Sequence, residues 1–252
     1  MDAGLSVVII ARDEEEAIGA ALESVSWADE IVLVDSGSRD RTVQIARARG
    51  AKVVETGDWP GFGPQKNRAL DHATRDWVLS IDADERVTPE LREQIKSVVS
   101  GGGAAHDAYE MPRLSSYCGR FMRHGGWWPD RVTRLFRRSK ARFSDDIVHE
   151  RVVVQGSTGR LEGHLLHEAF DDFEEVLRKV DQYSTANARM LHARGKRGSL
   201  ASAILHGGWA FLRTYVLRAG FLDGRHGFML AVSNAEGTYY RYLKLMRLGE
   251  KR

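Results

Sequence analysis

The chain has 252 residues, of which 29% are charged and 42% hydrophobic, and its formal net charge is +2. This composition is typical of an ordered globular chain and excludes a disordered or fibrous one. The apolar run at residues 5–10 is too short for a signal peptide or a membrane span. Cys118 is the only cysteine, so an internal disulfide is excluded and a reducing, cytoplasmic setting is expected.

The charge is unevenly distributed along the chain. Residues 178–252 contain fourteen Lys or Arg and four Asp or Glu, a local charge of +10, so the rest carries −8. An acidic N-terminal part is suited to a divalent metal, and a basic C-terminal part to an anionic surface. Two ordinary solvated faces are the alternative. No nucleic-acid recognition motif accompanies the basic residues, so we expect no nucleic-acid partner.

Strand and helix patterns alternate over the first hundred residues, which favours a parallel sheet covered by helices. The first apolar run, LSVVII, is rich in β-branched side chains, as expected for a strand that is buried on both faces. We expect strands at residues 5–10, 31–34, 52–55 and 77–81.

Signals for helix starts lie between these strands. Asp13 with Glu16 three residues later has the spacing of a capping box, and Asp40 is placed to cap a second helix. Proline in the first turn after a capping threonine marks another start. The expected helices cover residues 13–24, 40–49 and 65–73, and a fourth begins at Thr88-Pro89.

The pattern changes after the glycines at 101–103, where strand-like pieces indicate a mixed sheet and are followed by helical periodicity. The fold class expected is α/β, a mixed sheet flanked by helices over residues 1–170, with a helical and basic C-terminal extension over 171–252. The strand-like pieces lie at 108–117, 132–137, 151–155 and 161–166, and the helical segments at 173–190, 200–219 and 228–248.

The most informative motif is a pair of carboxylates, Asp82-Ala83-Asp84, placed directly after the strand WVLSI. In open α/β sheets ligands bind outside the carboxyl ends of the strands. Magnesium is typically held by one or two carboxylates, and substrate phosphates complete its shell. Short acidic turns are common, but this position before a capped helix favours a metal site that assists a departing diphosphate.

Asp35 closes a second apolar strand and enters a Ser/Gly turn. One interpretation is a turn residue that accepts hydrogen bonds from its own backbone. The other is a contact to the base or ribose of a nucleotide. Both interpretations place Asp35 at the same edge of the sheet as Asp82 and Asp84.

The segments LSVVIIARDEEEAI, IVLVDSGSRDRT, QKNRAL and WVLSIDADE resemble, in order and spacing, the N-terminal half of family 2 inverting glycosyltransferases. WWPDRVTRLFRR and VHERVVVQG are similar to the lipopolysaccharide-core β-1,4-glucosyltransferase subgroup, so the resemblance covers nearly the whole chain. It implies a GT-A fold of the Rossmann-like type, a UDP-sugar donor, a divalent metal (Mg or Mn) and inversion at the anomeric carbon. Residues 1–100 would then form the nucleotide-sugar-binding half and 101–170 the acceptor half.

The resemblance also implies roles for single residues. Asp35 matches the residue that binds the nucleobase, Asp82 the one near the ribose, and Asp84 the direct metal ligand. Many relatives have Pro-Thr-Tyr after the first strand where Ile10-Ala11-Arg12 stand here, so Arg12 would stack on the base by its guanidinium plane. The positions expected at the donor are Ala11, Arg12, Asp35, Gln65, Lys66, Asn67, Asp82, Ala83 and Asp84.

Lys66 is expected to face the diphosphate, with a solvated surface lysine as the alternative. Direct inverting displacement also needs a base that takes the proton of the acceptor hydroxyl. In the resembling family an acidic residue of the second half does this, and the candidates here are Glu150, Asp145 and Asp146. We favour Glu150, because it adjoins a strand-like run, and Asp146 is the second choice. A surface ion pair is the alternative for Glu150.

His164, His167 and Glu168 lie close together in sequence, but HxxH without a third spaced ligand is weak support for zinc. Some GT-A enzymes complete the metal shell with a histidine of the second half, and His167 resembles that position. The metal ligands expected are therefore Asp84 and His167. A hydrogen-bonded histidine at a strand end is the alternative.

Acceptor contacts are expected in and after a Gly/Pro-rich loop. Trp127 and Trp128 have flat faces that suit sugar rings, although packing of one tryptophan into the core is the ordinary outcome. Arg131 and Arg134 follow closely and can bind phosphate on an acidic acceptor. Further along, residues 200–222 combine aromatic, aliphatic and basic side chains, which suits either packing on the catalytic body or contact with a membrane interface.

The function expected is that of a metal-dependent inverting hexosyltransferase of family 2. It would move a sugar, with glucose as the favoured one, from a UDP-sugar to a phosphorylated glycolipid or oligosaccharide such as the lipopolysaccharide core. The location expected is cytoplasmic and peripheral on the inner face of the membrane. The alternatives are a sugar nucleotidyltransferase, which the missing glycine-rich loop after the first strand disfavours, and a non-catalytic, membrane-peripheral nucleotide-sugar-binding protein. No dinucleotide or P-loop motif is present.

Overall fold

The computed structural model describes residues 4–101, 105–144 and 150–250. Its contacts divide the chain into two compact units. Unit 1 comprises Met1–Arg113 and Asp130–His167, and unit 2 comprises Leu114–Pro129 and Glu168–Arg252. The predicted boundary after residue 170 lies close to the second crossing between the units, but residues 114–129 group with the C-terminal helices.

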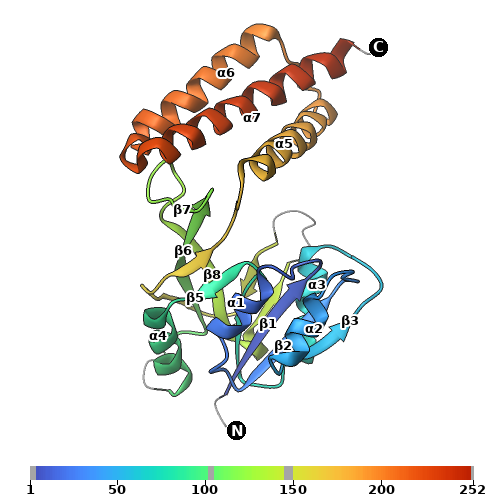
Figure 1. Ribbon diagram of the computed structural model, residues 1–252, viewed down its shortest axis with the longest axis vertical. Coiled ribbons are helices and arrows are strands. Elements are labelled where there is room, and N and C mark those ends of the chain that lie inside the picture. Colours follow the sequence, from blue (N-terminus) through green and yellow to red (C-terminus); the bar gives the residue numbers. More distant parts are fainter. Residues whose placement is uncertain (1–3, 102–104, 145–149, 251–252) are drawn as a thin grey trace. The chain divides into compact units, whose positions relative to one another are not determined.

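Unit 1 is built around a mixed sheet, several strands of which are labelled in Figure 1. The order of its strands is β3-β2-β1-β4-β8-β6-β12-β5. The first four strands of this order are parallel to one another, and β8 joins β4 in antiparallel register. In chain order the elements are β1 (Leu5–Ala11), α1 (Ile18–Ser24), β2 (Glu30–Asp35), α2 (Thr42–Ala48), β3 (Lys52–Glu55), α3 (Phe62–His72), β4 (Trp77–Ser80), β5 (Glu85–Val87), α4 (Pro89–Val99), β6 (Ala108–Tyr117), β8 (Asp130–Arg137), a 3-10 turn (Arg138–Lys140), β9 (Ala141–Phe143), β10 (Val152–Val154), β11 (Thr158–Arg160) and β12 (Leu165–His167).

Both faces of this sheet are covered, as the apolar run of the first strand predicts. Along β1, Val7 and Ile9 belong to one buried cluster, which also holds side chains of α1, α2 and α4. Val8 and Ile10 belong to a second cluster with side chains of α3 and of the β9–β10 pair. Because the side-chain period of a strand is two, one apolar run supplies both layers of the core.

The predicted capping box at Asp13 and Glu16 is wrong. The helix begins at Ile18, and Asp13 has a left-handed backbone with φ of 55°. The Asp13 backbone N–H donates to Ser38 Oγ at 2.9 Å, and its carboxylate accepts from the Arg39 N–H at 2.7 Å. The segment after β1 is therefore bound to the turn after β2 instead of starting a helix.

The other helix starts agree better with the sequence. Asp40 Oδ1 accepts from the backbone N–H of Thr42 at 2.9 Å, so it satisfies an amide at the start of α2. Thr88 caps α4, with Pro89 in the first turn. The helix expected at 65–73 starts three residues earlier, at Phe62, and ends at His72.

Unit 2 is mainly helical. The end of β6 pairs with β7 (Arg120–Phe121), and the long helices are α5 (Phe173–Ala193), α6 (Leu200–Leu212) and α7 (Gly224–Glu250). The expected helix at 200–219 ends at Leu212 and continues as a π-helical segment, Arg213–Leu217, followed by a 3-10 turn, Gly220–Asp223. No helix of the described residues has the length and apolarity needed to cross a membrane.

Small side chains set the packing of α6. Its buried residues are Ala203, Gly207 and Ala210, and they face α7. A methyl group at Gly207 would lie 3.2 Å from the Tyr239 Cβ, so the two helices approach closely there. Because the small residues take the inner face, the large apolar side chains of α6 lie on the outside.

Candidate functional site

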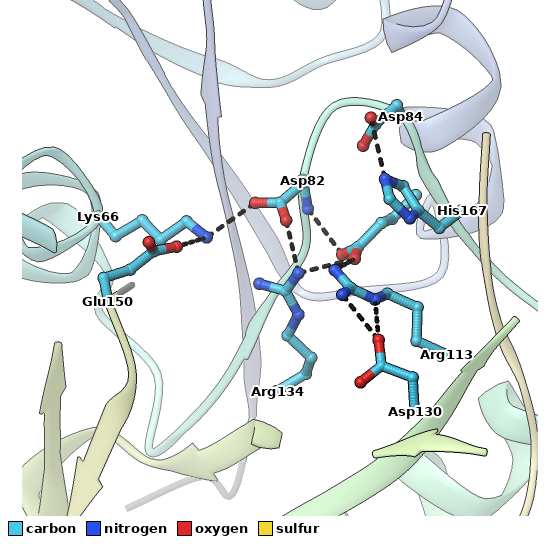
Figure 2. A network of polar contacts seen from close by, with 9 residues as sticks. Lys66, Asp82, Asp84, Arg113, Asp130, Arg134, Glu150 and His167 are labelled. Atoms are coloured by element: carbon cyan, nitrogen blue, oxygen red, sulfur yellow. Dashed lines mark hydrogen bonds and ion pairs between the residues drawn. The ribbon is translucent and has the colours of Figure 1, made fainter. Parts of the chain in front are cut away.

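The acidic turn expected from the sequence lies between β4 and β5. The backbone N–H of Glu85 donates to the Asp82 carbonyl at 3.0 Å, and the Asp82 N–H donates to the Glu85 carboxylate at the same distance. Glu85 is fully buried. These two hydrogen bonds close the turn and direct the Asp82 and Asp84 side chains to different surroundings (Figure 2).

Asp82 lies between two cations. One carboxylate oxygen is 2.8 Å from Lys66 Nζ, and the other is 2.5 Å from the Arg134 guanidinium. Burial by itself would raise the pKa of the Asp82 carboxyl. The charges of Arg134 and Lys66 outweigh that effect and hold its pKa well below the usual range.

Arg134 extends the network to Glu85, at 2.7 Å. Burial would lower the pKa of the Arg134 guanidinium, but Asp82 and Glu85 raise it above its ordinary value. Arg113 lies 3.4 Å from Glu85 and 2.7 Å from Asp130, and it continues the chain of ion pairs. Alternating charges of this kind compensate one another where water is largely excluded.

Lys66 joins this network to the candidate base. Its Nζ donates to Glu150 Oε1 at 2.8 Å as well as contacting Asp82. The predicted alternative of a solvated surface lysine is wrong, because only 5% of the Lys66 side chain is exposed. Gly63 allows this approach of α3, since a Cβ there would lie 1.9 Å from the Ser144 carbonyl oxygen. Asp145 and Asp146, the other candidates for the base, lie outside the described residues.

Asp84 has different neighbours from Asp82. Its Oδ2 lies 3.3 Å from His167 Nε2, and 36% of its side chain is exposed. The antiparallel pairing of β12 with β5 sets His167 opposite Glu85, next to Asp84. The two predicted metal ligands are thus brought together. Within the described residues no group of three or more His, Cys, Asp or Glu side chains is arranged to hold a metal.

Asp35 shows the turn geometry that was one of its two interpretations. Its Oδ1 accepts from the backbone N–H groups of Gly37 and Ser38, both at 2.9 Å, and its Oδ2 accepts from the Ser38 hydroxyl. The side chain is buried. Ala11 pairs with Asp35 in the sheet register, and Arg12 follows with an exposed side chain. Contact of these residues with a nucleotide stays a prediction.

Gln65 and Asn67 hold loops in place. The Gln65 amide nitrogen donates to the hydroxyls of Ser36 and Thr56, at 2.9 and 2.8 Å. Asn67 exchanges two hydrogen bonds with the backbone of Phe143, at 2.9 and 3.0 Å. Both residues thus position the elements around α3, and a direct contact of either with a donor stays a prediction.

A cavity of about 440 Å³ opens beside the network of ion pairs. Five of its lining side chains are cationic and two are carboxylates, which favours an anionic occupant. Its lining includes Arg131, whose guanidinium lies 3.0 Å from the exposed Glu162 carboxylate. The charged lining residues are Lys66, Arg113, Arg131, Arg134, Arg151, Asp82 and Glu150.

The two tryptophans expected at the acceptor belong to unit 2. Trp127 packs edge-on against Tyr117, with ring centroids 5.8 Å apart, and its ring lies 5.9 Å from that of Phe170. Trp128 lies under the Arg123 guanidinium at 5.8 Å. Packing of one tryptophan in a core cluster is therefore what the structure shows for Trp127, and acceptor contact stays a prediction for both.

Sequence reasoning missed three members of the network, Glu85, Arg113 and Asp130. Glu85 directly follows the acidic pair, so its position was a usable signal. Nothing in the sequence around Arg113 marks it, because its partner Glu85 is 28 residues away and meets it only through the register of the sheet.

Comparison with known proteins agrees with this architecture. The family model described as glycosyl transferase family 2 matches residues 6–151. An uncharacterized glycosyltransferase of Rickettsia typhi is 32% identical, over 98% of this chain and 88% of its own. The lipopolysaccharide core biosynthesis glycosyltransferase LpsC of Rhizobium meliloti is 30% identical, over 98% of this chain and 92% of its own.

The chain belongs to glycosyltransferase family 2. Its fold is also shared by a solved structure. A fragment of S. aureus TarS in complex with UDP aligns over 98% of this chain and 92% of that chain, with a TM-score of 0.51 and 16% sequence identity. The predicted class, a mixed GT-A sheet flanked by helices with a helical C-terminal part, is confirmed.

Proposed function

We propose that this glycosyltransferase moves a hexose from a UDP-sugar to a phosphorylated glycolipid, with inversion at the anomeric carbon and with the help of a divalent cation. The observation that carries the proposal is the unequal setting of the two turn carboxylates. Asp82 is neutralised by Lys66 and Arg134, whereas Asp84 is more exposed and lies beside His167.

Asp84 and His167 fit a divalent cation. Two ligand atoms in adjacent positions around a magnesium ion, each about 2.1 Å from it, lie about 3 Å apart. The 3.3 Å between Asp84 Oδ2 and His167 Nε2 is close to this spacing. A bound Mg²⁺ or Mn²⁺ would offset the charge that develops on the departing diphosphate. Donor phosphate oxygens would supply further ligands, as is usual where a protein offers few carboxylates.

Glu150 is the base that we propose, and it lines the cationic cavity. The acceptor hydroxyl oxygen forms a bond to the anomeric carbon of the donor sugar, and the bond from that carbon to the phosphate oxygen breaks. The bonding electron pair leaves with the nucleoside diphosphate, while Glu150 receives the hydroxyl proton. The ion pair with Lys66 holds the Glu150 carboxylate at the lining of the cavity.

We place the nucleoside of the donor next to the turn after β2. Asp35 fixes that turn through its own hydrogen bonds, and Gln65 ties it to α3 through Ser36. A nucleoside would therefore meet an ordered surface formed by Ala11, Arg12 and Asp35. TarS, which shares the fold, has been crystallised with UDP. A UDP-sugar is accordingly the donor that we propose here.

The acceptor proposal rests on charge. The cavity beside Asp82 is lined by more cations than carboxylates, and Arg131 and Arg134 are among them. A phosphorylated acceptor complements this lining. The similarity to LpsC, a lipopolysaccharide core biosynthesis glycosyltransferase, supports a lipopolysaccharide core as that acceptor.

We further propose that unit 2 contacts an anionic membrane surface through the outer face of α6. This face is formed by six large side chains that are each at least 43% exposed, and Arg213 and Arg218 follow in the same region. An apolar face with flanking cations is typical of interfacial helices. The outer face comprises Leu200, Ile204, Leu205, Trp209 and Leu212 of α6, continued by Val216 of the π-helical segment.

The decisive experiment measures UDP release from UDP-glucose with Mn²⁺, with and without a phosphorylated core oligosaccharide. The wild-type protein should release UDP, and EDTA should abolish the reaction. Asp84→Ala should lower the rate by about a hundredfold or more, because removing one charge-stabilising group in a catalytic site costs that much. Asp71→Ala is the matched control, since Asp71 forms an exposed pair with Arg142. Full activity of Asp84→Ala would refute the metal assignment.

Glu150→Gln separates binding from chemistry. Donor affinity, measured by thermal shift with metal present, should stay close to that of the wild type, while transfer should fall by about a hundredfold or more. Unaltered transfer would remove Glu150 from the role of base. Pyrophosphate release from UTP and a sugar phosphate would instead indicate a nucleotidyltransferase, and donor binding without any turnover would indicate a non-catalytic protein.

A further inference from the structure

Unit 2 contains a cavity of its own, which the proposed reaction does not use. It has a volume of about 240 Å³ and lies between α5, α7, the end of β6 and the loop that carries Trp127. Ligand pockets for drug-sized molecules commonly have about 300–1,000 Å³. The unit 2 cavity is therefore suited to a smaller group, of the size of one sugar ring.

Aromatic rings form one wall of the unit 2 cavity. Tyr117, Trp127 and Phe170 lie in mutual contact, with centroids 5.8 to 6.0 Å apart. Tyr117 is buried, and its hydroxyl is 2.8 Å from Ser233 Oγ. Burial raises the pKa of this hydroxyl above its ordinary value, so it stays neutral. A rigid aromatic wall with fixed polar edges suits the apolar face of a sugar ring.

The rest of the lining combines the apolar side chains of Val176, Val180 and Leu230 with polar and positively charged ones. Lys179 and Arg241 line the cavity, and no Asp or Glu is among the described lining residues. The buried Nε of Arg241 has no hydrogen-bond partner within the described residues. A buried donor that lacks a partner carries a desolvation cost. Asn187 and Asn234 add amide groups to the same lining.

We propose that the unit 2 cavity binds one anionic sugar residue, carboxylated or phosphorylated, of the acceptor glycan. The sugar ring would stack on the wall that contains Trp127, and its anionic group would accept hydrogen bonds from Arg241 and Lys179. An acyl chain fits this lining less well, because it offers no acceptor to Arg241, and Lys179 has only the Glu175 carboxylate, 3.8 Å away, to balance its charge. The proposal rests on the proposed function only in naming the acceptor as the source of this sugar.

The test measures binding in the full chain without donor or metal. The indole N–H signals of the tryptophans are recorded by NMR, and Trp127→Phe identifies the local one. Glucuronate and glucose 6-phosphate should shift the Trp127 signal in a saturable way, and at concentrations at least tenfold lower than neutral glucose. Inorganic phosphate alone should leave this signal in place, because it has no ring to stack. A stronger effect of glucuronate than of glucose 6-phosphate, or the reverse, identifies the anionic group.

Arg241→Gln should weaken the binding of both anionic sugars at least tenfold and leave glucose unchanged, and Arg241→Lys should restore part of the loss. Arg247→Gln is the matched control, since Arg247 lies on the same helix but pairs with Glu250 at its end. Thermal unfolding checks that each variant is folded. An unmoved Trp127 signal with every sugar, or anion binding that is insensitive to Arg241→Gln, overturns the proposal. Failure of the transferase assay leaves this binding result unaffected, so the two proposals are tested separately.

Discussion

In unit 1, Lys66 and Arg134 are almost completely buried and each lies between two carboxylates. In unit 2, large apolar side chains of α6 are exposed instead, and Leu205 has 71% of its surface accessible. One unit thus buries charge and the other exposes hydrophobic surface. Both arrangements are unfavourable for an isolated globular domain.

The difference indicates which kind of partner each unit binds. Buried, compensated charges hold their geometry without rearrangement when a charged ligand arrives, and such settings are frequent at functional sites. An exposed apolar face loses its cost only when another apolar phase covers it. We therefore expect the stability of unit 1 to depend on its ion pairs, and the partner of unit 2 to be a surface.

Arg134→Met should give the largest effect on stability, because it leaves Asp82 and the fully buried Glu85 without their shared cation. Removing one partner of a buried ion pair typically costs about 3–5 kcal/mol. The measurement is the hydrogen exchange of the β4 backbone amides in increasing urea, which reports on unit 1 by itself.

Arg131→Met is the matched control for Arg134→Met. Arg131 lies on the same strand, three residues away, and pairs with Glu162, whose side chain is 70% exposed. Surface ion pairs contribute about 0–1 kcal/mol, so this variant should be almost as stable as the wild type. Equal losses in the two variants would contradict the view that burial makes the network important.

Acid should lower the free energy of unfolding of unit 1, because it protonates the Asp82 carboxylate. Its pKa in the folded state is held below the ordinary value of about 3.9, because Arg134 and Lys66 outweigh burial. The stabilisation is therefore complete above about pH 4 and is lost as the pH falls below that value towards the folded pKa. Asp82→Asn should cost about 2 kcal/mol at pH 7 and progressively less in acid.

The same urea experiment at pH 7, 4 and 3 tests this pH dependence. The stabilities of wild type and Asp82→Asn should converge as the pH falls. A constant difference between them over this range would show that Asp82 does not supply the acid sensitivity. Asp71→Asn, on the surface, should follow the wild type at every pH.

The sequence predicted the parts of the fold that depend on local patterns. The run LSVVII indicated a strand buried on both faces, and its alternate residues do fill two core clusters. The failure at Asp13 had a long-range cause. Its partners, Ser38 and Arg39, are 25 and 26 residues away, and no local pattern records that the segments after β1 and β2 interlock.

The candidate site shows the same limit. The acidic turn was visible because both carboxylates follow one strand, and the family resemblance added His167. The ion pair of Lys66 with Glu150 spans 84 residues, and that of Arg134 with Glu85 spans 49. These partners are fixed by the approach of α3 to the β9–β10 pair and by the register of β8 on β4. Sequence patterns gave the residue types at these positions but not their pairing.

Leu205→Gln tests whether unit 2 binds a membrane surface. Its effect on the free energy of vesicle binding should be smaller than the effects of Arg134→Met and Asp82→Asn on the free energy of unfolding. Leu205 lies on the outer face of α6 and is the most exposed of its large apolar side chains. In the bound state the Leu205 side chain would be partly buried in the lipid. Its loss should weaken binding to phosphatidylglycerol vesicles about tenfold, which corresponds to about 1.4 kcal/mol. Vesicle flotation measures the bound fraction.

Leu177→Gln is the control for the outer face of α6, because Leu177 is an exposed apolar residue of α5. It should leave vesicle binding unchanged, and raising the salt concentration should weaken binding of the wild type by screening the arginines near α6. Equal losses in the two leucine variants would mean that apolar exposure in unit 2 is unspecific. Binding that depends on salt but not on Leu205 would instead assign the membrane contact to charge alone. The two units would then differ in that unit 1 buries its cations in ion pairs, whereas unit 2 presents its cations to the membrane.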